Sequence, residues 1–383
     1  MIKLVTILGA RPQFIKAVAV SAAIRKNYSH VISELILHTG QHYDENMSDI
    51  FFEELGLPRP HFQLNAASSN KSLQVGEMID GINAILKDEL PDLVLVYGDT
   101  TSTLAGALAA SGLKIPLVHI EAGLRSFNKS MPEELNRIVC DQLSTMLFTP
   151  TQQAIQNLAH EGMRYNAENP VSLSNPGIFE CGDVMLDVAR IFKERITAMS
   201  WKDVGLIQPT KKWILCTLHR EQNTSNRDNL RSIVQSILTL PGTQDCEIVW
   251  PLHPRTKKLL ESAGETDLLT QLWSHPAIHL CEPLSYLQTQ FLLHHCGVVL
   301  TDSGGLQKEA FFAGKPSVIM RNETEWVELL DGHYTILCDC DQVRMTKAVT
   351  RQWNKDLDNS PSFYGNGNAA ASILNTIVSL FDI

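Results

Sequence analysis

The chain has 383 residues and a mass of 42.7 kDa, more than one hydrophobic core normally holds, so two domains are expected. With 44% hydrophobic and 19% charged residues, the composition predicts a soluble globular protein. The formal net charge of −10 argues against a general nucleic-acid or anionic-membrane binder, since both need a basic surface. That charge still permits a local basic pocket for one anionic ligand.

Targeting and cysteine patterns favour a cytoplasmic protein. No apolar run approaches the roughly 20 residues that a membrane helix needs. The apolar opening of the chain runs straight into Arg11-Pro12 without a cleavage site, so we interpret it as a strand. The 8 cysteines include no C-x-x-C pair, which predicts reduced thiols and no metal site.

Short apolar runs alternate with segments of helical periodicity, as is typical of β-α-β units and parallel sheets. In the first half, strands are predicted at Ile2–Gly9, Ser33–Thr39, Leu93–Tyr97, Leu117–Ile120, Met146–Thr149 and Phe179–Cys181. The helices predicted between and after them are Pro12–Lys26, Leu73–Lys87, Thr101–Ser111, Pro132–Leu143, Thr151–His160 and Val184–Ile196.

The periodicity breaks over Ser200–Lys212 and then starts afresh. In the second half, strands are predicted at Trp213–Leu218, Glu247–Leu252, Ile278–Cys281, Gly297–Thr301 and Ser317–Met320. Helices are predicted at Arg227–Leu238, Tyr286–Cys296, Gly305–Phe312, Trp326–Leu330 and Ala369–Phe381.

This order predicts an α/β protein of two Rossmann-type, doubly wound domains that face each other across a cleft. The expected boundaries are 1–196 for the first domain and 197–365 for the second. The last segment, 366–383, is expected to be a helix that packs back on the first domain. Ligands in such sheets lie at the carboxyl ends of the strands.

Polar residues follow the predicted strands of the first domain. Arg11 and Lys16 come after the first strand, where a helix N-terminus could help them meet an anion. Asp99, Glu121 and Glu133 could share a pocket and act as acid and base. Simpler interpretations stay open: Asp99 as a helix N-cap, and the two carboxylates after Pro132 as complements of the helix dipole.

In the second domain, His219 follows one strand and the string Thr301-Asp302-Ser303-Gly304-Gly305 follows another. An apolar strand that runs through Ser-Gly-Gly into a helix can cradle a phosphate with free N–H groups. An ordinary capped turn explains the string equally well. With Arg321 on the same side, these residues predict a diphosphate ligand held mainly by the second domain.

Several strings together resemble the non-hydrolysing UDP-N-acetylglucosamine 2-epimerases, in the family's order and over nearly the whole chain. They are Gly9-Ala10-Arg11-Pro12, Tyr97-Gly98-Asp99-Thr100, His119-Ile120-Glu121-Ala122-Gly123-Leu124-Arg125, Pro132-Glu133-Glu134-Leu135-Asn136-Arg137, Thr301-Asp302-Ser303-Gly304-Gly305 and Thr324-Glu325. The resemblance implies a GT-B-like fold. It also implies a reaction that removes UDP from C1 by anti elimination, leaves a glucal, and adds UDP back after C2 is reprotonated on the other face.

The resemblance also implies roles for individual residues. Catalytic positions match at Asp99, Glu121, Glu133 and His219. Substrate-binding positions match at Arg11, Lys16, Arg137, Ser303, Gly304, Gly305, Glu309 and Arg321, with Glu309 holding the ribose hydroxyls. No cofactor and no metal are implied, and a homodimer is the expected assembly.

Some strings depart from the family pattern. Glu221 stands where many members carry Arg, and Gln41-His42-Tyr43-Asp44 departs from a segment that helps some members hold an activating UDP-GlcNAc. The strings Arg11–Lys16 and Thr324–Leu329 look more like the branch that epimerises UDP-2,3-diacetamido-glucuronic acid for O-antigen sugars. The sugar, the assignment of acid and base, and allosteric activation stay open. So do two alternatives, a hydrolysing 2-epimerase that releases UDP and a GT-B glycosyltransferase.

Overall fold

The structure, a computed structural model, describes residues 1–41, 52–66, 68, 70–262, 266–355, 357 and 361–381. Residues 42–44 of the string Gln41-His42-Tyr43-Asp44, which departs from the family pattern, lie outside the described residues. The chain forms two compact units: Met1–Ile191 with Ser362–Ile383, and Phe192–Pro361.

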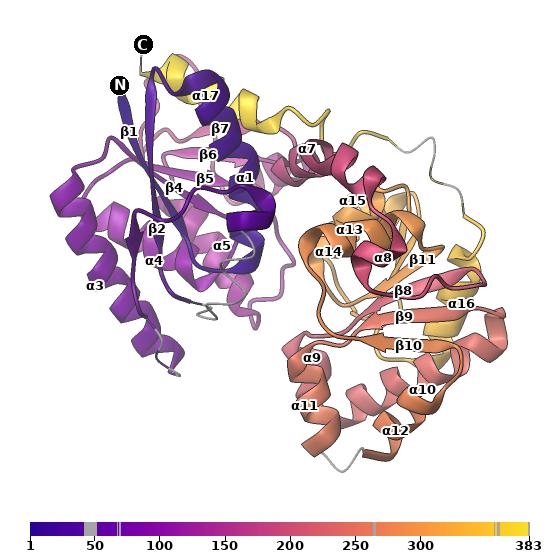
Figure 1. The fold of residues 1–383 in the computed structure, drawn as a ribbon. Helices are drawn as coiled ribbons and strands as arrows, with labels where there is room; N and C mark the ends of the chain where they lie inside the picture. The colour runs from indigo at the N-terminus through magenta and orange to yellow at the C-terminus, as the bar shows by residue number, and fades with distance from the viewer. Residues whose placement is uncertain are drawn as a thin grey trace. The chain divides into compact units, whose positions relative to one another are not determined.

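The first unit is built on a seven-stranded parallel sheet in the order β3-β2-β1-β4-β5-β6-β7 (Figure 1). Its strands are β1 (Ile2–Leu8), β2 (Ile32–His38), β3 (Phe62–Gln63), β4 (Leu93–Tyr97), β5 (Leu117–Ile120), β6 (Met146–Thr149) and β7 (Gly177–Glu180). Every residue of β4, β5 and β6 is buried, as expected where helices cover both faces of a parallel sheet.

The helices of the first unit lie between and after these strands, and three of them are capped by short polar side chains. They are α1 (Arg11–Ala23), the π-helix η1 (Ile24–Tyr28), α3 (Lys71–Glu89), α4 (Thr101–Gly112), α5 (Pro132–Leu143), α6 (Gln152–His160), α7 (Val184–Ala198, which runs on into the second unit) and α17 (Ala369–Leu380). Asn70, Thr100 and Thr151 accept backbone N–H bonds at the starts of α3, α4 and α6.

The second unit repeats the architecture with a six-stranded parallel sheet in the order β10-β9-β8-β11-β12-β13. Its strands are β8 (Trp213–Thr217), β9 (Glu247–Pro251), β10 (Ile278–Cys281), β11 (Val298–Thr301), β12 (Ser317–Ile319) and β13 (Thr335–Leu337). Its helices are α8 (Trp201–Val204), α9 (Glu221–Thr224), α10 (Arg227–Gln244), α11 (Pro254–Ser262), α12 (Thr266–Ser274), α13 (Tyr286–His295), α14 (Gly304–Phe312), α15 (Glu328–Asp331) and α16 (Gln342–Gln352).

Both sheets reverse their strand order once, between β1 and β4 and between β8 and β11. This is the strand order of the Rossmann fold, so the predicted fold class of two doubly wound α/β domains is confirmed. In such sheets the crevice at the reversal point, outside the carboxyl ends of the strands, is where ligands bind. The strings that begin at Gly9, Tyr97 and Thr301 lie at the carboxyl ends of β1, β4 and β11.

The C-terminal helix α17 belongs to the first unit and contacts α1. Asp187, on α7, accepts hydrogen bonds from Ala369 N (3.0 Å) and Ala370 N (2.8 Å) and so caps the start of α17. The inner side of α17 buries Ile373, Leu374 and Ile377. One buried carboxylate and an apolar stripe therefore fix the returning end of the chain.

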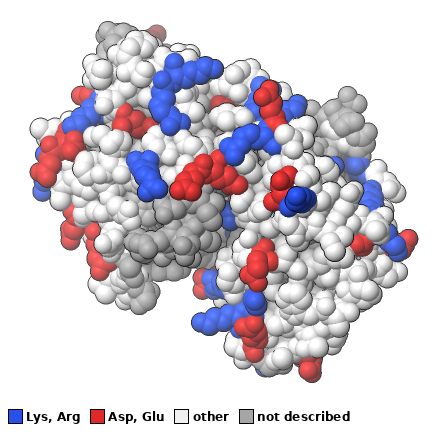
Figure 2. All heavy atoms as spheres, viewed as in Figure 1, with Lys and Arg blue, Asp and Glu red and all other residues white. Residues whose placement is uncertain are grey.

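The molecular surface is mixed in charge on the face drawn in Figure 2, where Lys and Arg side chains are scattered among Asp and Glu. None of the helices in the described part of the chain combines the length and the apolar character needed to span a bilayer. All eight cysteines are free thiols, five of them buried.

Candidate active site

An ion pair between Lys16 and Glu121 lies at the reversal point of the first sheet. Lys16 comes from α1 and Glu121 directly follows β5, and Nζ lies 2.5 Å from Oε1. Both side chains are buried, with Lys16 and Glu121 each 8% exposed. Glu121 has φ +71°, a left-handed conformation that costs free energy for a residue with a Cβ and is found most often at functional sites.

Gly98, at the end of β4, lies against this ion pair. Its φ of +61° favours glycine, and a Cβ there would lie 3.0 Å from Lys16 Nζ and 3.3 Å from Glu121 Oε1. The close approach and the backbone conformation therefore both require glycine. The turn brings the next residue, Asp99, to the same edge of the sheet.

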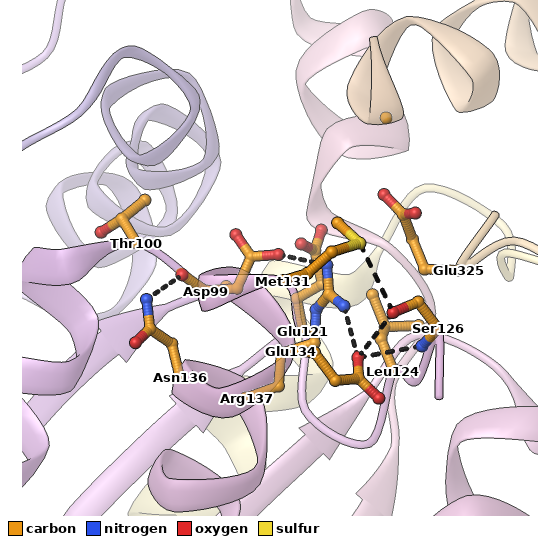
Figure 3. Close-up of polar contacts among 12 residues, drawn as sticks. Asp99, Thr100, Glu121, Leu124, Ser126, Met131, Glu134, Asn136, Arg137 and Glu325 are labelled. Carbon is orange, nitrogen blue, oxygen red and sulfur yellow. Dashed lines mark hydrogen bonds and ion pairs between the residues drawn. The ribbon is translucent and has the colours of Figure 1, made fainter. Parts of the chain in front are cut away.

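Asp99 is held by two residues of α5 (Figure 3). Arg137 Nη2 lies 2.5 Å from Asp99 Oδ2, and Asn136 Nδ2 donates to the Asp99 carbonyl at 2.8 Å. The Asp99 side chain is 28% exposed, so its second oxygen can reach solvent or a ligand. Thr100, not Asp99, caps α4, so the N-cap interpretation of Asp99 is wrong.

The two carboxylates after Pro132 point to different environments. Glu134 is buried, accepts from Ser126 N and Phe127 N (both 2.9 Å), and pairs with Arg137 Nη1 at 2.8 Å (Figure 3). Glu133, the predicted catalytic residue, is exposed in the first turn of α5. The structure therefore brings Asp99, Arg137 and Glu134 into one hydrogen-bonded group and leaves Glu133 on the surface.

Gln13 is a site residue that the sequence did not reveal. Its buried Oε1 accepts from Gly9 N (2.9 Å) and Ala10 N (3.1 Å), while Nε2 donates to Tyr97 O (3.2 Å). This amide ties the end of β1 to the end of β4 and fixes the start of α1, where Arg11 lies half-buried. A glutamine in the first turn of a helix carries no sequence signal for the bond to Tyr97 O.

In the second unit, Asp302 organises the reversal point. It is fully buried after β11 and accepts from His219 N (3.1 Å), Arg220 N (2.8 Å) and Asn223 Nδ2 (3.2 Å). The His219 Nδ1 atom lies 3.3 Å from Asp302 Oδ1, and the imidazole side chain is 40% exposed. The sequence places Asp302 in a motif but assigns it no role. In the structure, Asp302 holds the loop that carries His219 through these hydrogen bonds.

The Ser-Gly-Gly turn leads from β11 into α14. Ser303 Oγ accepts from Leu306 N at 3.4 Å, so the interpretation of this serine as a helix cap is confirmed. A Cβ on Gly304 would lie 2.3 Å from Glu325 Oε1, whereas one on Gly305 would meet only open space. Glu309 is partly buried one turn further along α14.

Two arginines surround Glu325 beside this turn. Arg321 is 3% exposed and its Nη1 donates to Glu325 Oε2 at 3.0 Å, and Arg220 Nη2 lies 3.8 Å from Glu325 Oε1. Within the described residues, Arg321 Nε and Nη2 have no hydrogen-bond partner. Burial lowers the pKa of Arg321, only partly offset by Glu325. Two guanidinium groups on one carboxylate leave positive charge that suits an anionic ligand.

Comparison with known proteins identifies the family. The family model described as UDP-N-acetylglucosamine 2-epimerase matches residues 25–378. The chain belongs to this family. The recognition made from the sequence strings is therefore confirmed, and the protein is an isomerase of the 2-epimerase type.

Individual relatives match this epimerase over nearly its full length. UDP-2,3-diacetamido-2,3-dideoxy-D-glucuronate 2-epimerase of Pseudomonas aeruginosa is 44% identical over 99% of this chain and 100% of its own. The crystal structure of UDP-GlcNAc 2-epimerase of Methanocaldococcus jannaschii with UDP-GlcNAc and UDP has a TM-score of 0.88 and 37% identity, covering 98% and 99% of the two chains. The enzyme of Neisseria meningitidis bound to UDP-GlcNAc has a TM-score of 0.86 and 30% identity, covering 98% and 100%.

Each unit of the epimerase thus carries one polar group at its reversal point. The first unit supplies carboxylates held by Lys16 and Arg137, and the second supplies His219, the α14 turn and Arg321. Among the described residues, no three His, Cys, Asp or Glu side chains gather in a way that could hold a metal ion.

Proposed function

We propose that this epimerase inverts C2 of a UDP-2-acetamido sugar without releasing free sugar, with UDP-2,3-diacetamido-2,3-dideoxy-D-glucuronate as the first substrate to test. The relative that is 44% identical over its full length carries that name, and it supports this choice. UDP-GlcNAc is the second candidate, supported by the 37% identical structure solved with UDP-GlcNAc and UDP.

The buried Lys16–Glu121 pair carries the proposal. It lies against Gly98, the residue that precedes Asp99 in the sequence. The C2 proton of a 2-acetamido sugar is not acidified by a neighbouring ring carbonyl. Its removal therefore needs a well-placed carboxylate together with departure of the leaving group at C1. Carboxylates held in fixed positions at one sheet edge meet the first requirement.

The reaction balances without any added reagent. A carboxylate takes the C2 proton while the C1–O bond breaks, its electron pair leaves with UDP, and a C1–C2 double bond forms. A second group then donates a proton to the opposite face of C2, and the UDP oxygen bonds again to C1. We assign this chemistry to Asp99, Glu121 and Glu133, with His219 beside the diphosphate.

The second unit is the proposed UDP site. The open space at Gly305, the start of α14 and the Arg321 guanidinium favour a diphosphate, because N–H groups and cations meet there. Glu309 is proposed to hold the ribose hydroxyls. Arg11, Lys16 and Arg137 are the proposed contacts from the first unit.

The test is incubation in D2O with each of the two UDP-sugars, followed by NMR. Deuterium at C2 in an intact UDP-manno product supports the proposal and identifies the accepted sugar. Free UDP together with free manno sugar would instead assign the hydrolysing reaction. Absence of C2 exchange with both sugars would contradict the proposal and favour a glycosyltransferase.

Location and assembly are further proposals. The eight free thiols support a reducing compartment such as the cytoplasm, and the O-antigen branch supports a role in polysaccharide synthesis. A homodimer is proposed from family membership. Size-exclusion chromatography with light scattering tests it, since a dimer has twice the mass of 42.7 kDa.

A further inference from the structure

A fully buried histidine contacts the turn at Gly98, and the proposed chemistry does not use it. His119, on β5, is 0% exposed. Its Nε2 lies 2.7 Å from Gly98 O and its Nδ1 lies 2.7 Å from Asp141 Oδ1 on α5. Both distances are those of hydrogen bonds, so both ring nitrogens have partners.

The partner of His119 Nε2, the Gly98 carbonyl, requires this nitrogen to donate. A backbone carbonyl can only accept. Asp141 already accepts from Gly123 N (3.1 Å) and Arg125 Nη1 (2.7 Å), and Arg125 is in turn paired with Glu161. Although burial alone would raise it, the bonds and charges of His119 and Arg125 hold the pKa of Asp141 below its usual value. Asp141 therefore holds the His119 ring at Nδ1, and Nε2 donates to Gly98 O.

The His119 ring fixes the turn that carries Asp99. Gly98 N donates to Ile120 O at 2.9 Å, and Gly98 O accepts from His119, so the peptide group on each side of Gly98 is held. The same glycine lies against the Lys16–Glu121 pair. Any rotation of the Gly98 carbonyl therefore moves Asp99 relative to Glu121.

We propose that His119 is a positioning residue for epimerisation, which acts through its hydrogen bond to the Gly98 carbonyl. The inference rests on the proposed function, in which Asp99 and Glu121 face the sugar. A displacement of about 1 Å at a reacting group can cost on the order of 100-fold in rate. Loss of this bond should consequently lower kcat while leaving KM nearly unchanged.

Two variants separate this bond from a general role in folding. A glutamine amide reaches the position of Nε2 and can still donate to Gly98 O, whereas an asparagine amide reaches only the position of Nδ1. We expect His119→Asn to lower kcat by about 100-fold and His119→Gln by less than about 10-fold, with KM within about threefold in both. Equal loss of kcat in the two variants, or a change confined to KM, would overturn the proposal.

Two measurements on the wild-type enzyme complete the test. Exchange of the C2 hydrogen in D2O by the wild type shows that the proposed function holds. If the wild type exchanges this hydrogen and the two variants lose kcat equally, only the role of His119 is contradicted. Nitrogen-15 NMR of histidine-labelled protein, with the His119 signals assigned from the variants, should show a proton on Nε2, the nitrogen that donates to Gly98 O. A His119 ring without a proton on Nε2 would overturn the proposal even if neither variant folds.

Discussion

Two adjacent glutamates of α5 show how a single step along a helix separates two environments. Successive helical residues are turned by about 100°, so the helix directs Glu134 inward to Arg137 and directs Glu133 to the surface. The sequence string alone cannot say which of the two is buried. The proposed catalytic role of Glu133 and the structural role of Glu134 can therefore be tested as a matched pair.

We expect Glu134→Gln to destabilise the protein by about 3 kcal/mol, since it leaves the buried Arg137 without one of its charged partners. Chemical denaturation measures the effect. Glu133→Gln is the control and should change the free energy of unfolding by no more than about 0.5 kcal/mol, because the side chain is exposed. Equal destabilisation by both variants would contradict the assignment of Glu134 as the structural carboxylate.

Glu121→Gln should abolish most turnover and leave UDP binding intact. The amide keeps the shape of the side chain but cannot take the C2 proton, and acid–base groups contribute about 100- to 10,000-fold to rate. UDP affinity should stay within about twofold, because the proposed UDP contacts lie mainly in the second unit. Exchange at C2 and calorimetric titration of UDP measure the two effects. Turnover equal to that of the wild type would remove Glu121 from the catalytic roles.

The sequence predicted which strand ends carry polar chemistry but not every residue that holds it in place. Lys16, Asp99 and Glu121 follow from residue type and strand position, and the structure places all three at the reversal point. Gln13 and Asp302 were not assigned roles, because each also binds a backbone group distant in the sequence, Tyr97 O and His219 N respectively. Such partnerships are set by tertiary structure and leave no local pattern.

At the scale of elements, buried strands were predicted best and polar helices worst. The bounds of β4, β5, β6 and β10 were predicted as the structure has them, because each is a compact apolar run. Six elements of the second unit were missed: α8, α9, α11, α12, β13 and α16. In α16 only Met345, Ala348, Val349 and Gln352 are buried, so the apolar stripe is narrow. Helix α10 continues through Pro241, where a proline normally ends a helix.

The start of α14 has a structural and a proposed binding role, and Ser303→Ala separates them. Loss of the cap should cost about 1 kcal/mol in the free energy of unfolding. If the hydroxyl also holds a phosphate, UDP affinity should fall by about 10-fold, which corresponds to one hydrogen bond to a charged group. Thermal unfolding and calorimetric titration read the two effects. Unaltered UDP affinity alongside lowered stability would leave the cap as the whole role of Ser303.

An ion pair between the neighbouring strands β9 and β10 makes the stability of the second unit depend on pH. Burial opposes the charge on Glu247, but hydrogen bonds from His279 and from Thr210 and Lys211 lower its pKa from 4.5 to about 2. The stability that this carboxylate contributes is therefore complete above about pH 4.5 and is lost as the pH falls toward 2.

Glu247→Gln should consequently destabilise the second unit at pH 7, and the difference from the wild type should shrink steadily below pH 4.5. Urea unfolding at pH 7, 4 and 3, followed by tryptophan fluorescence, measures it. Glu282→Gln is a suitable control, since that carboxylate is 81% exposed and lies 3.5 Å from Lys257 Nζ. A difference that stays constant down to pH 3 would contradict the role of the Glu247 carboxylate.

On the scale of the whole molecule, the chain leaves the first unit after Ile191 and returns to it at Ser362. The 6 tryptophans all lie between those points, at positions 201, 213, 250, 273, 326 and 353. Tryptophan fluorescence therefore reports on the second unit, whereas the far-ultraviolet circular dichroism signal contains both. Comparing the two signals therefore measures how much α17 contributes to the stability of the first unit.

Asp187→Ala removes both caps from the start of α17, so it should destabilise the first unit by about 1 to 2 kcal/mol. We expect the circular dichroism transition to move to lower urea concentration and the tryptophan transition to move less, because the cap lies in the unit without tryptophan. Glu194→Ala, an exposed carboxylate on the same helix α7, should move neither. Equal displacement of both transitions by Asp187→Ala would mean that the two units unfold as one cooperative body, and that α17 stabilises the whole chain rather than the unit it caps.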